Sequence, residues 1–160
     1  MSGGADRFAA AAAALGLTPD VHRFPAGTKT AVDAARAIGC HVAQIVKSLV
    51  FIAGDRPVLA LTSGSNRVDT AKLAALAGAP EVRRATPEEV REATGFAIGG
   101  TPPFGHPAPL RTFVDRDLLP YATVWAAAGT PDAVFPLTPD VLVSVADAEV
   151  ADLAERGARG

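Results

Sequence analysis

The chain has 160 residues, a formal net charge of −2 and one cysteine, which excludes an internal disulfide framework and a cysteine-rich zinc site. Its apolar fraction of 49% and charged fraction of 20% exclude a disordered chain, so we expect residues 1–160 to form one domain with a real core. The near-neutral charge argues against a protein that grips a long stretch of nucleic acid.

Short helices and strands are predicted in the first quarter of the chain. Residues 6–15 are rich in alanine and predict a helix that is ended by Gly16 and Pro19. They do not resemble a signal peptide, because the basic start of one is missing. The pattern that follows predicts a short strand at residues 21–24 and a turn at residues 25–27. Thr30 is expected to cap a second helix, which ends before Gly39.

A β-hairpin is predicted next. Residues 45–52 are apolar and β-branched except at Lys47 and Ser48, which is typical of a buried strand. A tight turn at residues 54–57 and a return strand at residues 58–62 complete the hairpin.

The remaining elements mix helices and strands. Asp69 is expected to cap a helix over residues 69–77, and Thr86 a helix that stops near Gly95. Further strands are predicted at residues 111–114, 123–127 and 134–137, and helical turns at residues 139–143 and 146–155. Since strands and helices do not alternate strictly, this order indicates an α+β (mixed α/β) fold with a mixed β-sheet flanked by helices.

Lys47 is the first residue that the packing of a core does not explain. In an extended strand it shares a face with Ile45, Leu49 and Phe51. An unpaired ammonium ion is costly to bury, so the side chain either snorkels at the strand edge or binds a phosphate or an ester carbonyl as a point charge. The sequence pattern leaves both interpretations open.

The loop at residues 99–107, with the sequence GGTPPFGHP, is the second unusual feature. Adjacent glycines allow backbone N–H groups to approach a ligand closely, and two prolines stiffen the segment that follows. The loop is therefore either an ordinary rigid turn or part of an oxyanion-type pocket. It has neither the P-loop nor the dinucleotide-binding spacing.

The other polar and aromatic residues carry weaker signals. The histidines are scattered without metal-ligand spacing, and Cys40 is expected to be an idle thiol. Asn66 and Arg67 either contact phosphate or solvate a loop. Asp115 is expected to cap the turn that follows it, and Trp125 to lie in the core.

Three segments together resemble the YbaK / prolyl-tRNA synthetase editing-domain family in order and spacing: residues 30–35 (TAVDAA), 44–51 (QIVKSLVF) and 95–106 (GFAIGGTPPFGH). The likeness extends from about Val21 to the C-terminus. It implies the family's mixed sheet flanked by helices, and hydrolysis of the ester that joins a mischarged amino acid to the tRNA 3′ end. Stand-alone members act in trans, mainly on tRNA(Pro), so Ala, Ser, Thr or Cys is the expected amino acid.

The resemblance also implies site residues. The family's key lysine falls on Lys47, and its glycine-to-proline loop falls on Gly99 to Pro103, so the expected catalytic residues are Lys47, Gly99, Gly100 and Thr101. The expected substrate-binding residues are Thr30, Ser48, Pro102, Pro103, His106 and Val134. Some members have Asp or His where rough alignment puts Val134, so their amino-acid preference does not transfer.

The expected mechanism needs no metal or organic cofactor. Lys47 would anchor a phosphate of the terminal adenosine or polarise the ester carbonyl, and the loop amides would stabilise the oxyanion. Water would attack with help from the free ribose hydroxyl, and a small cavity would exclude cognate proline.

The expected partners are the tRNA 3′ end and an aminoacyl-tRNA synthetase, with no DNA and no membrane. A cytoplasmic location is expected, because a single cysteine suits a reducing compartment. Two alternatives stay open: a non-catalytic module that binds an aminoacyl group or a tRNA end, and an interaction protein associated with a synthetase.

Overall fold

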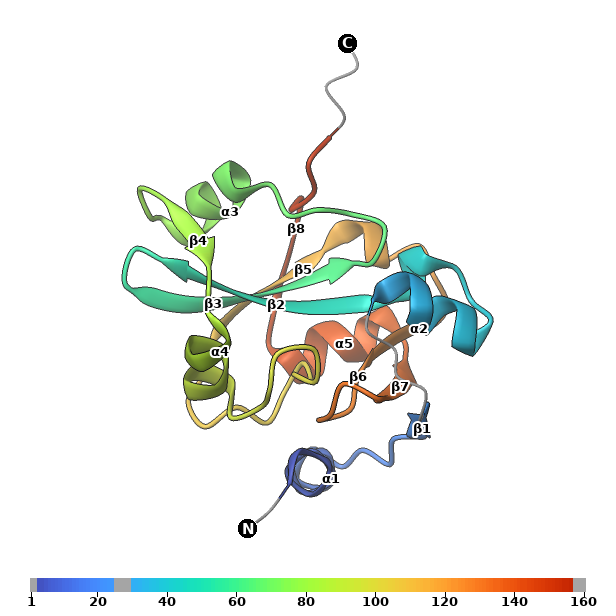
Figure 1. The fold of residues 1–160 in the computed structure, drawn as a ribbon. Helices are drawn as coiled ribbons and strands as arrows, with labels where there is room; N and C mark the ends of the chain where they lie inside the picture. The colour runs from blue at the N-terminus through green and yellow to red at the C-terminus, as the bar shows by residue number, and fades with distance from the viewer. Residues whose placement is uncertain (1–2, 25–29, 157–160) are drawn as a thin grey trace.

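The computed structural model describes residues 3–24 and 30–156, so the turn expected at residues 25–27 lies outside the described part (Figure 1). Its larger sheet has five strands in the order β4-β2-β3-β5-β8, and its smaller sheet has three in the order β1-β7-β6. The strands of the larger sheet are β2 (Val46–Ala53), β3 (Arg56–Ser63), β4 (Val82–Arg84), β5 (Arg111–Asp115) and β8 (Glu149–Ala151). Those of the smaller sheet are β1 (His22–Arg23), β6 (Val124–Ala127) and β7 (Ala133–Leu137).

The larger sheet is mixed. The β2–β3 hairpin and the β2–β4 pair are antiparallel, whereas β5 runs parallel to β3 and β8 runs parallel to β5. In the part of the chain that the structure describes, five α-helices surround the two sheets: α1 (Gly4–Ala14), α2 (Ala31–Ile38), α3 (Thr70–Ala77), α4 (Pro87–Thr94) and α5 (Pro139–Ala146). The expected fold class, a mixed sheet flanked by helices, is confirmed.

The predicted helix starts are confirmed by their capping bonds. The Thr30 hydroxyl accepts the Asp33 N–H at 3.0 Å at the start of α2. Thr86 and Glu89 form a reciprocal capping box at the start of α4, with bonds of 2.9 and 3.2 Å. The Asp69 carboxylate accepts two backbone N–H groups at the start of α3.

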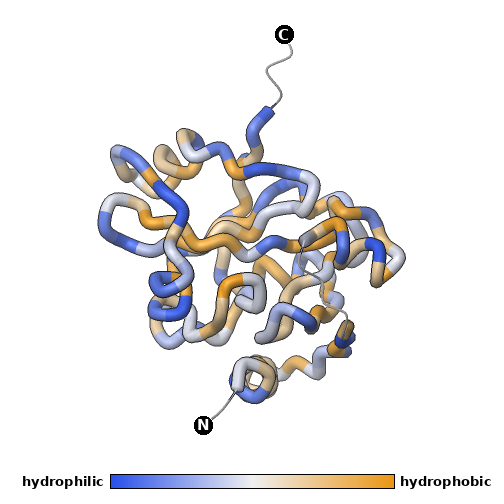
Figure 2. Tube along the Cα trace, viewed as in Figure 1, coloured by the Kyte–Doolittle hydropathy of each residue, from blue (hydrophilic) through white to orange (hydrophobic). Residues whose placement is uncertain are grey.

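Alternation along the strands sends side chains into two cores. On one face, Val46, Val50 and Leu61 pack with α1, α4, α5 and the smaller sheet. On the other face, Phe51 and Phe113 pack with α3 and Leu153. Figure 1 shows α3 on one side of the larger sheet and α4, α5 and the smaller sheet on the other. Figure 2 shows hydrophobic residues along the central strands and hydrophilic ones at many of the outer turns.

Two predictions about the C-terminal half were incomplete or wrong. The helical turn expected at residues 146–155 is wrong, because α5 ends at Ala146 with Asp147 as its C-cap at a φ of +49°, and residues 149–151 form β8. Pairing with β5 overrides the helix-favouring Ala and Glu of this segment. Strand β4 was missed, since its Val-Arg-Arg sequence has no strand pattern of its own and is extended by pairing with β2. None of the helices in the described ranges is long and apolar enough to cross a bilayer.

Candidate functional site

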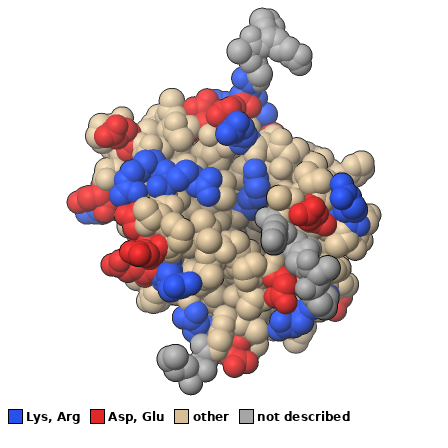
Figure 3. Space-filling model, viewed as in Figure 1, with Lys and Arg blue, Asp and Glu red and all other residues tan. Residues whose placement is uncertain are grey.

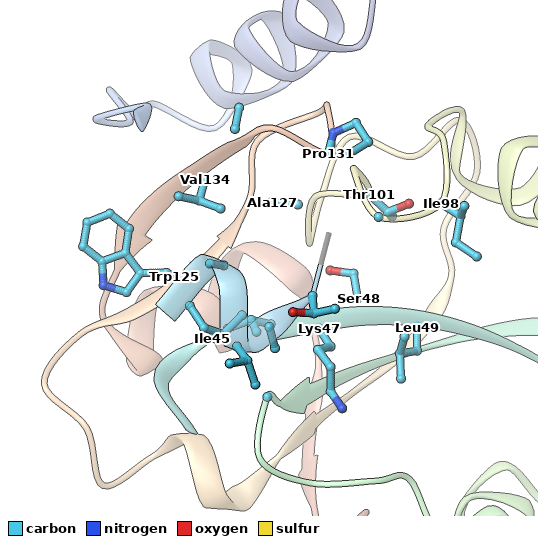
Figure 4. Close-up of a pocket in the computed structure, with 18 residues that line it drawn as sticks. Ile45, Lys47, Ser48, Leu49, Ile98, Thr101, Trp125, Ala127, Pro131 and Val134 are labelled. Carbon is cyan, nitrogen blue, oxygen red and sulfur yellow. The ribbon is translucent and has the colours of Figure 1, made fainter. Parts of the chain in front are cut away.

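A cavity of about 690 Å³ lies where the two sheets separate (Figure 4). The sheets meet at a parallel bridge between Ile45 and Trp125, and the cavity lies beyond that bridge. Its walls come from α2, the first half of β2, the loop before residue 102, and strands β6 and β7. The lining residues are Thr30, Ala31, Val32, Ala34, Ile45, Val46, Lys47, Ser48, Leu49, Gly64, Ile98, Gly99, Thr101, Trp125, Ala127, Pro131, Ala133 and Val134.

Among residues 3–24 and 30–156, no strand pairs with this edge of β2 between the bridge at Ile45 and the β4 pairing at Phe51, Ile52 and Ala53, so the edge is open where it borders the cavity. The Gly64 N–H donates to the Ile45 carbonyl, so the odd-numbered residues of β2 form the backbone hydrogen bonds to β3. The N–H and C=O groups of the even-numbered β2 residues therefore point away from β3. The Ala85 N–H bonds to the Val50 carbonyl at 3.0 Å, which agrees with this pattern. The Ser48 N–H accordingly points toward the open edge.

The Ser48 side chain adds a second polar group at the same place. It lies on the cavity face of β2 with Val46 and Val50, and Figure 4 shows it on the same side of the strand as Thr101 and Pro131. The Ser48 Oγ is buried and has no hydrogen-bond partner among the described residues. A buried hydroxyl without a partner is unfavourable, so this group has unused bonding capacity for a ligand.

The Lys47 ammonium ion does not face the glycine–proline loop. The backbone of Lys47 borders the cavity, but its side chain lies on the opposite face of β2 from Ser48, as Figure 4 shows. Its Nζ donates to the Asn66 carbonyl at 2.6 Å. Of the two roles expected for Lys47, this arrangement disfavours polarising the ester carbonyl beside the loop amides and leaves the phosphate anchor, because neighbouring strand residues point to opposite faces.

Lys47 belongs to a cluster of cations, which we define as Lys47, Arg67 and Arg84. Partial burial lowers the pKa of Lys47, and the positive charges of Arg84 and Arg67 lower it further, while Asp115 opposes the shift. Figure 3 shows a row of Lys and Arg side chains on this face, above β4 and the middle of β2. Cations held close together favour a bound anion.

The loop expected to supply an oxyanion site lies partly in the cavity wall. Gly99 and Thr101 line the cavity, and Gly99 has the positive φ of +85° that glycine accepts readily. The amide of Gly100 is already used, since it donates to the Ala97 carbonyl at 3.0 Å. Gly100 instead packs against the backbone of Thr130 and Pro131, which holds the loop in place.

Three residues expected to contact substrate lie outside the cavity lining. Pro102 and Pro103 are buried within the loop and do not line the cavity. The His106 Nε2 lies 2.9 Å from the Pro102 carbonyl, and burial lowers the pKa of this imidazole. The neutral ring therefore donates to that carbonyl, which braces the loop from behind.

The cavity wall opposite the loop contains Thr30, Val134 and Trp125. The Thr30 hydroxyl is engaged as the helix cap, and Val134 is almost fully buried in β7. Trp125, expected in the core, is only partly buried and lines the cavity, with its ring edge-on to His22. The small residues beside it, Ala127 and Ala133, gave no sequence signal, because alanine is equally common in cores.

The remaining titratable residues do not suggest metal chemistry. Among residues 3–24 and 30–156, no group of three or more His, Cys, Asp or Glu side chains is arranged to hold a metal ion. Burial raises the pKa of the Cys40 thiol, which favours its protonated, unreactive form.

Comparison with known proteins identifies the family. The family model of the aminoacyl-tRNA editing domain matches residues 25–145. The uncharacterised protein YwhH of Bacillus subtilis is 35% identical over 124 residues, which are 77% of this chain and 78% of that protein. The proline–tRNA ligase of Nitratidesulfovibrio vulgaris (strain DP4) is 36% identical over 112 residues, 70% of this chain but only 18% of the ligase.

A solved structure gives the same answer. The crystal structure of a candidate trans-editing enzyme for prolyl-tRNA synthetase superposes with a TM-score of 0.91 at 51% identity, covering 98% of this chain and 99% of that one. The match of fold, length and sequence is therefore nearly end to end. The chain belongs to the family of aminoacyl-tRNA editing domains.

Proposed function

We propose that this chain is a trans-acting deacylase that removes a small amino acid from mischarged tRNA, with tRNA(Pro) as the first candidate. The observation that carries the proposal is the open edge of β2. There the Ser48 hydroxyl has no partner among the described residues and shares the cavity with Gly99 and Thr101. The family membership and the likeness to a candidate trans-editing enzyme for prolyl-tRNA synthetase support it.

The size of the cavity bears on what it admits. A volume of about 690 Å³ is within the range that encloses a whole small ligand, so it suits an aminoacyl group together with part of the terminal adenosine. Volume alone therefore does not exclude proline, contrary to the simple expectation of a small cavity. We place the selectivity in the local shape around Trp125, Ala127 and Val134, whose apolar surfaces disfavour a charged side chain.

Val32 and Ile98 define the mouth of the cavity. Both line it, yet they are 53% and 44% exposed. An aminoacyl group that enters between them leaves its ribose at the mouth and its phosphate on the outer surface. The cluster of Lys47, Arg67 and Arg84 is suited to that phosphate, because it presents positive charge on the other face of the same strand that forms the cavity floor.

The reaction then divides between two sides of β2. On the cavity side, the Ser48 N–H and hydroxyl, with the amides of Gly99 and Thr101, stabilise the negative charge that develops on the ester carbonyl oxygen. Water adds to the carbonyl carbon, the bond to the ribose oxygen breaks, and a proton passes from water to that oxygen by way of the neighbouring hydroxyl. On the other side, Lys47 anchors the phosphate, so its contribution is to binding.

The test is a deacylation panel with Ala-, Ser-, Thr-, Cys- and Pro-tRNA(Pro). Ser48→Ala should lower kcat by a factor on the order of 100 to 1,000, because it removes one donor to the oxyanion and leaves the amides in place. Lys47→Ala should raise KM with little change in kcat and should reduce the slope of log(kcat/KM) against log[salt] by about 0.7.

Arg56→Ala is the matched control for Lys47→Ala. Arg56 is exposed at the far end of the hairpin from the cavity, so its loss changes net charge by the same amount without touching the site. Unchanged kinetics in both Lys47→Ala and Ser48→Ala would refute the assignment of the site. Tight binding of aminoacyl-tRNA without turnover of any panel member would favour a binding module. Turnover only with a synthetase present would favour a docked form of the enzyme.

A further inference from the structure

A buried carboxylate lies near the Lys47 ammonium ion without bonding to it. Asp115, at the end of β5, has no exposed surface. As expected it caps the following turn, where its Oδ1 accepts the Asp117 N–H at 2.9 Å. Its Oδ2 also accepts the Ser63 N–H at 3.1 Å and the Asn66 side-chain amide at 2.9 Å.

These bonds converge on the loop that follows β3. Ser63 is the last residue of β3, and Asn66 in the loop provides both the side chain that bonds to Asp115 and the carbonyl that accepts from Lys47. The Asn66 Nδ2 bonds to the Asp117 carboxylate as well, at 2.8 Å. Both protons of this side-chain amide are thus used, and the loop is fixed at two points on β5 and the turn after it.

The network continues to Arg156 in the C-terminal segment. Arg156 pairs with Asp117 at 2.9 Å and with Asp152 at 2.7 Å, and Lys72 pairs with Asp152 at 2.9 Å. Within the described ranges, Asp115 itself has no cation within ion-pair distance, so three N–H donors compensate its burial. All of its bonds therefore organise backbone and loop geometry.

The cation cluster needs such an organiser. Lys47 has a long flexible side chain beside two arginines that repel it, and its ammonium ion donates to the Asn66 carbonyl at 2.6 Å. The negative charge of Asp115 acts on Lys47 from inside the protein and offsets part of that repulsion. If the loop moved, the ammonium ion would lose both its acceptor and its position relative to Arg67 and Arg84.

We propose that Asn66 and the buried Asp115 are positioning residues for Lys47. They fix the loop carbonyl that holds the ammonium ion and so preorganise the cation cluster for a phosphate of the RNA substrate. This inference rests on the proposed function, because it takes Lys47 to be the phosphate anchor.

A double-mutant cycle tests the inference, with Ala-tRNA(Pro), or the panel member that is deacylated fastest, as substrate. The variants are Lys47→Ala, Asn66→Ala and the double variant. Asn66→Ala keeps the backbone carbonyl but removes both side-chain bonds to Asp115 and Asp117. For Asn66→Ala we expect a KM several-fold above that of the parent and an unchanged kcat. In the double variant, KM should be no higher than in Lys47→Ala alone.

Three further variants keep the test decisive. Asp69→Ala removes the cap of α3, just after the same loop, and should lower Tm while leaving KM unchanged. Asn66→Ser replaces Asn66→Ala if the latter does not fold. Asp115→Asn keeps the shape of the side chain but loses its charge, and it should raise KM as Asn66→Ala does.

The outcomes separate the two proposals. A parent-like KM in Asn66→Ala or Asn66→Ser, or a rise that is equally large in the Lys47→Ala background, would overturn the positioning role alone. A parent-like KM and salt slope in Lys47→Ala would overturn the phosphate anchor and this inference with it. Coupling between Lys47 and Asn66 in KM, together with an unchanged KM in the Asp69→Ala control, supports the positioning role.

Discussion

Gly100→Ala is the substitution whose effect the structure defines most sharply. A Cβ atom at this position would lie 2.8 Å from the carbonyl carbon and the Cα of Thr130, and 3.0 Å from the nitrogen of Pro131. These atoms are backbone, so no side-chain rotation relieves the contact. The Gly100 N–H is also tied to the Ala97 carbonyl at 3.0 Å, so the segment cannot simply rotate.

The size of the effect follows from the overlap. The contact is about 0.6 Å shorter than ordinary van der Waals contact, which begins near 3.4 Å, so the loop must move away from Thr130 by roughly that distance. Gly99 and Thr101, which line the cavity, move with it. Since a misplacement of about 1 Å can cost about 100-fold in rate, we expect kcat/KM to fall about tenfold. Overpacking should also destabilise the fold by about 1–3 kcal/mol, or several degrees in Tm.

The assay is deacylation of the preferred panel substrate at a temperature well below the Tm of both proteins. Gly3→Ala is the control, because Gly3 has a φ of −76° and a Cβ atom added there would meet no neighbouring atom within 4 Å. A variant with lowered Tm but parental kcat/KM would show that the loop does not take part in the reaction. A variant with parental Tm and parental activity would show that Gly100 is not packed against Thr130 as described.

Two further predictions concern the cavity and the loop behind it. Trp125 is the one tryptophan of the chain and lines the cavity, so its fluorescence should shift when a non-hydrolysable aminoacyl-adenosine analogue binds. A Trp125→Phe variant should lose this signal. Saturable binding without any spectral change would place the ligand elsewhere. Burial lowers the pKa of His106 in the folded state, relative to its ordinary value of about 6.5. As the pH drops from 8 to 5.5, the unfolded chain therefore binds more protons than the folded chain, and the free energy of unfolding should fall. Urea unfolding of His106→Gln across this range should show a shallower dependence, whereas an identical slope would contradict a neutral, buried imidazole.

Much of the local structure was readable from the sequence, because its determinants are local. Capping by Thr30, Asp69 and Thr86 depends on bonds between residues two or three apart, and the hairpin depends on a tight turn between two apolar runs. Strand β8 was misassigned, since only pairing with β5 makes an Ala- and Glu-containing segment extended.

The site was predictable in part. The motif around Lys47 and Ser48 and the loop from Gly99 to Thr101 do meet at one cavity. The sequence did not indicate that Trp125, Ala127 and Ala133 form the opposite wall, because small and aromatic apolar residues have the same pattern in a core and in a cavity lining.

By itself, the sequence determined which residues differ from an ordinary core: a lysine in an apolar strand and a stiff glycine–proline loop. Only the tertiary structure decided which way they face, because strand register and the phase of the ladder are set by pairing with β3 and β4. That pairing puts Ser48 in the cavity, sends the Lys47 ammonium ion to the Asn66 carbonyl, and brings Asp115 from a strand far along the chain to fix the loop between them.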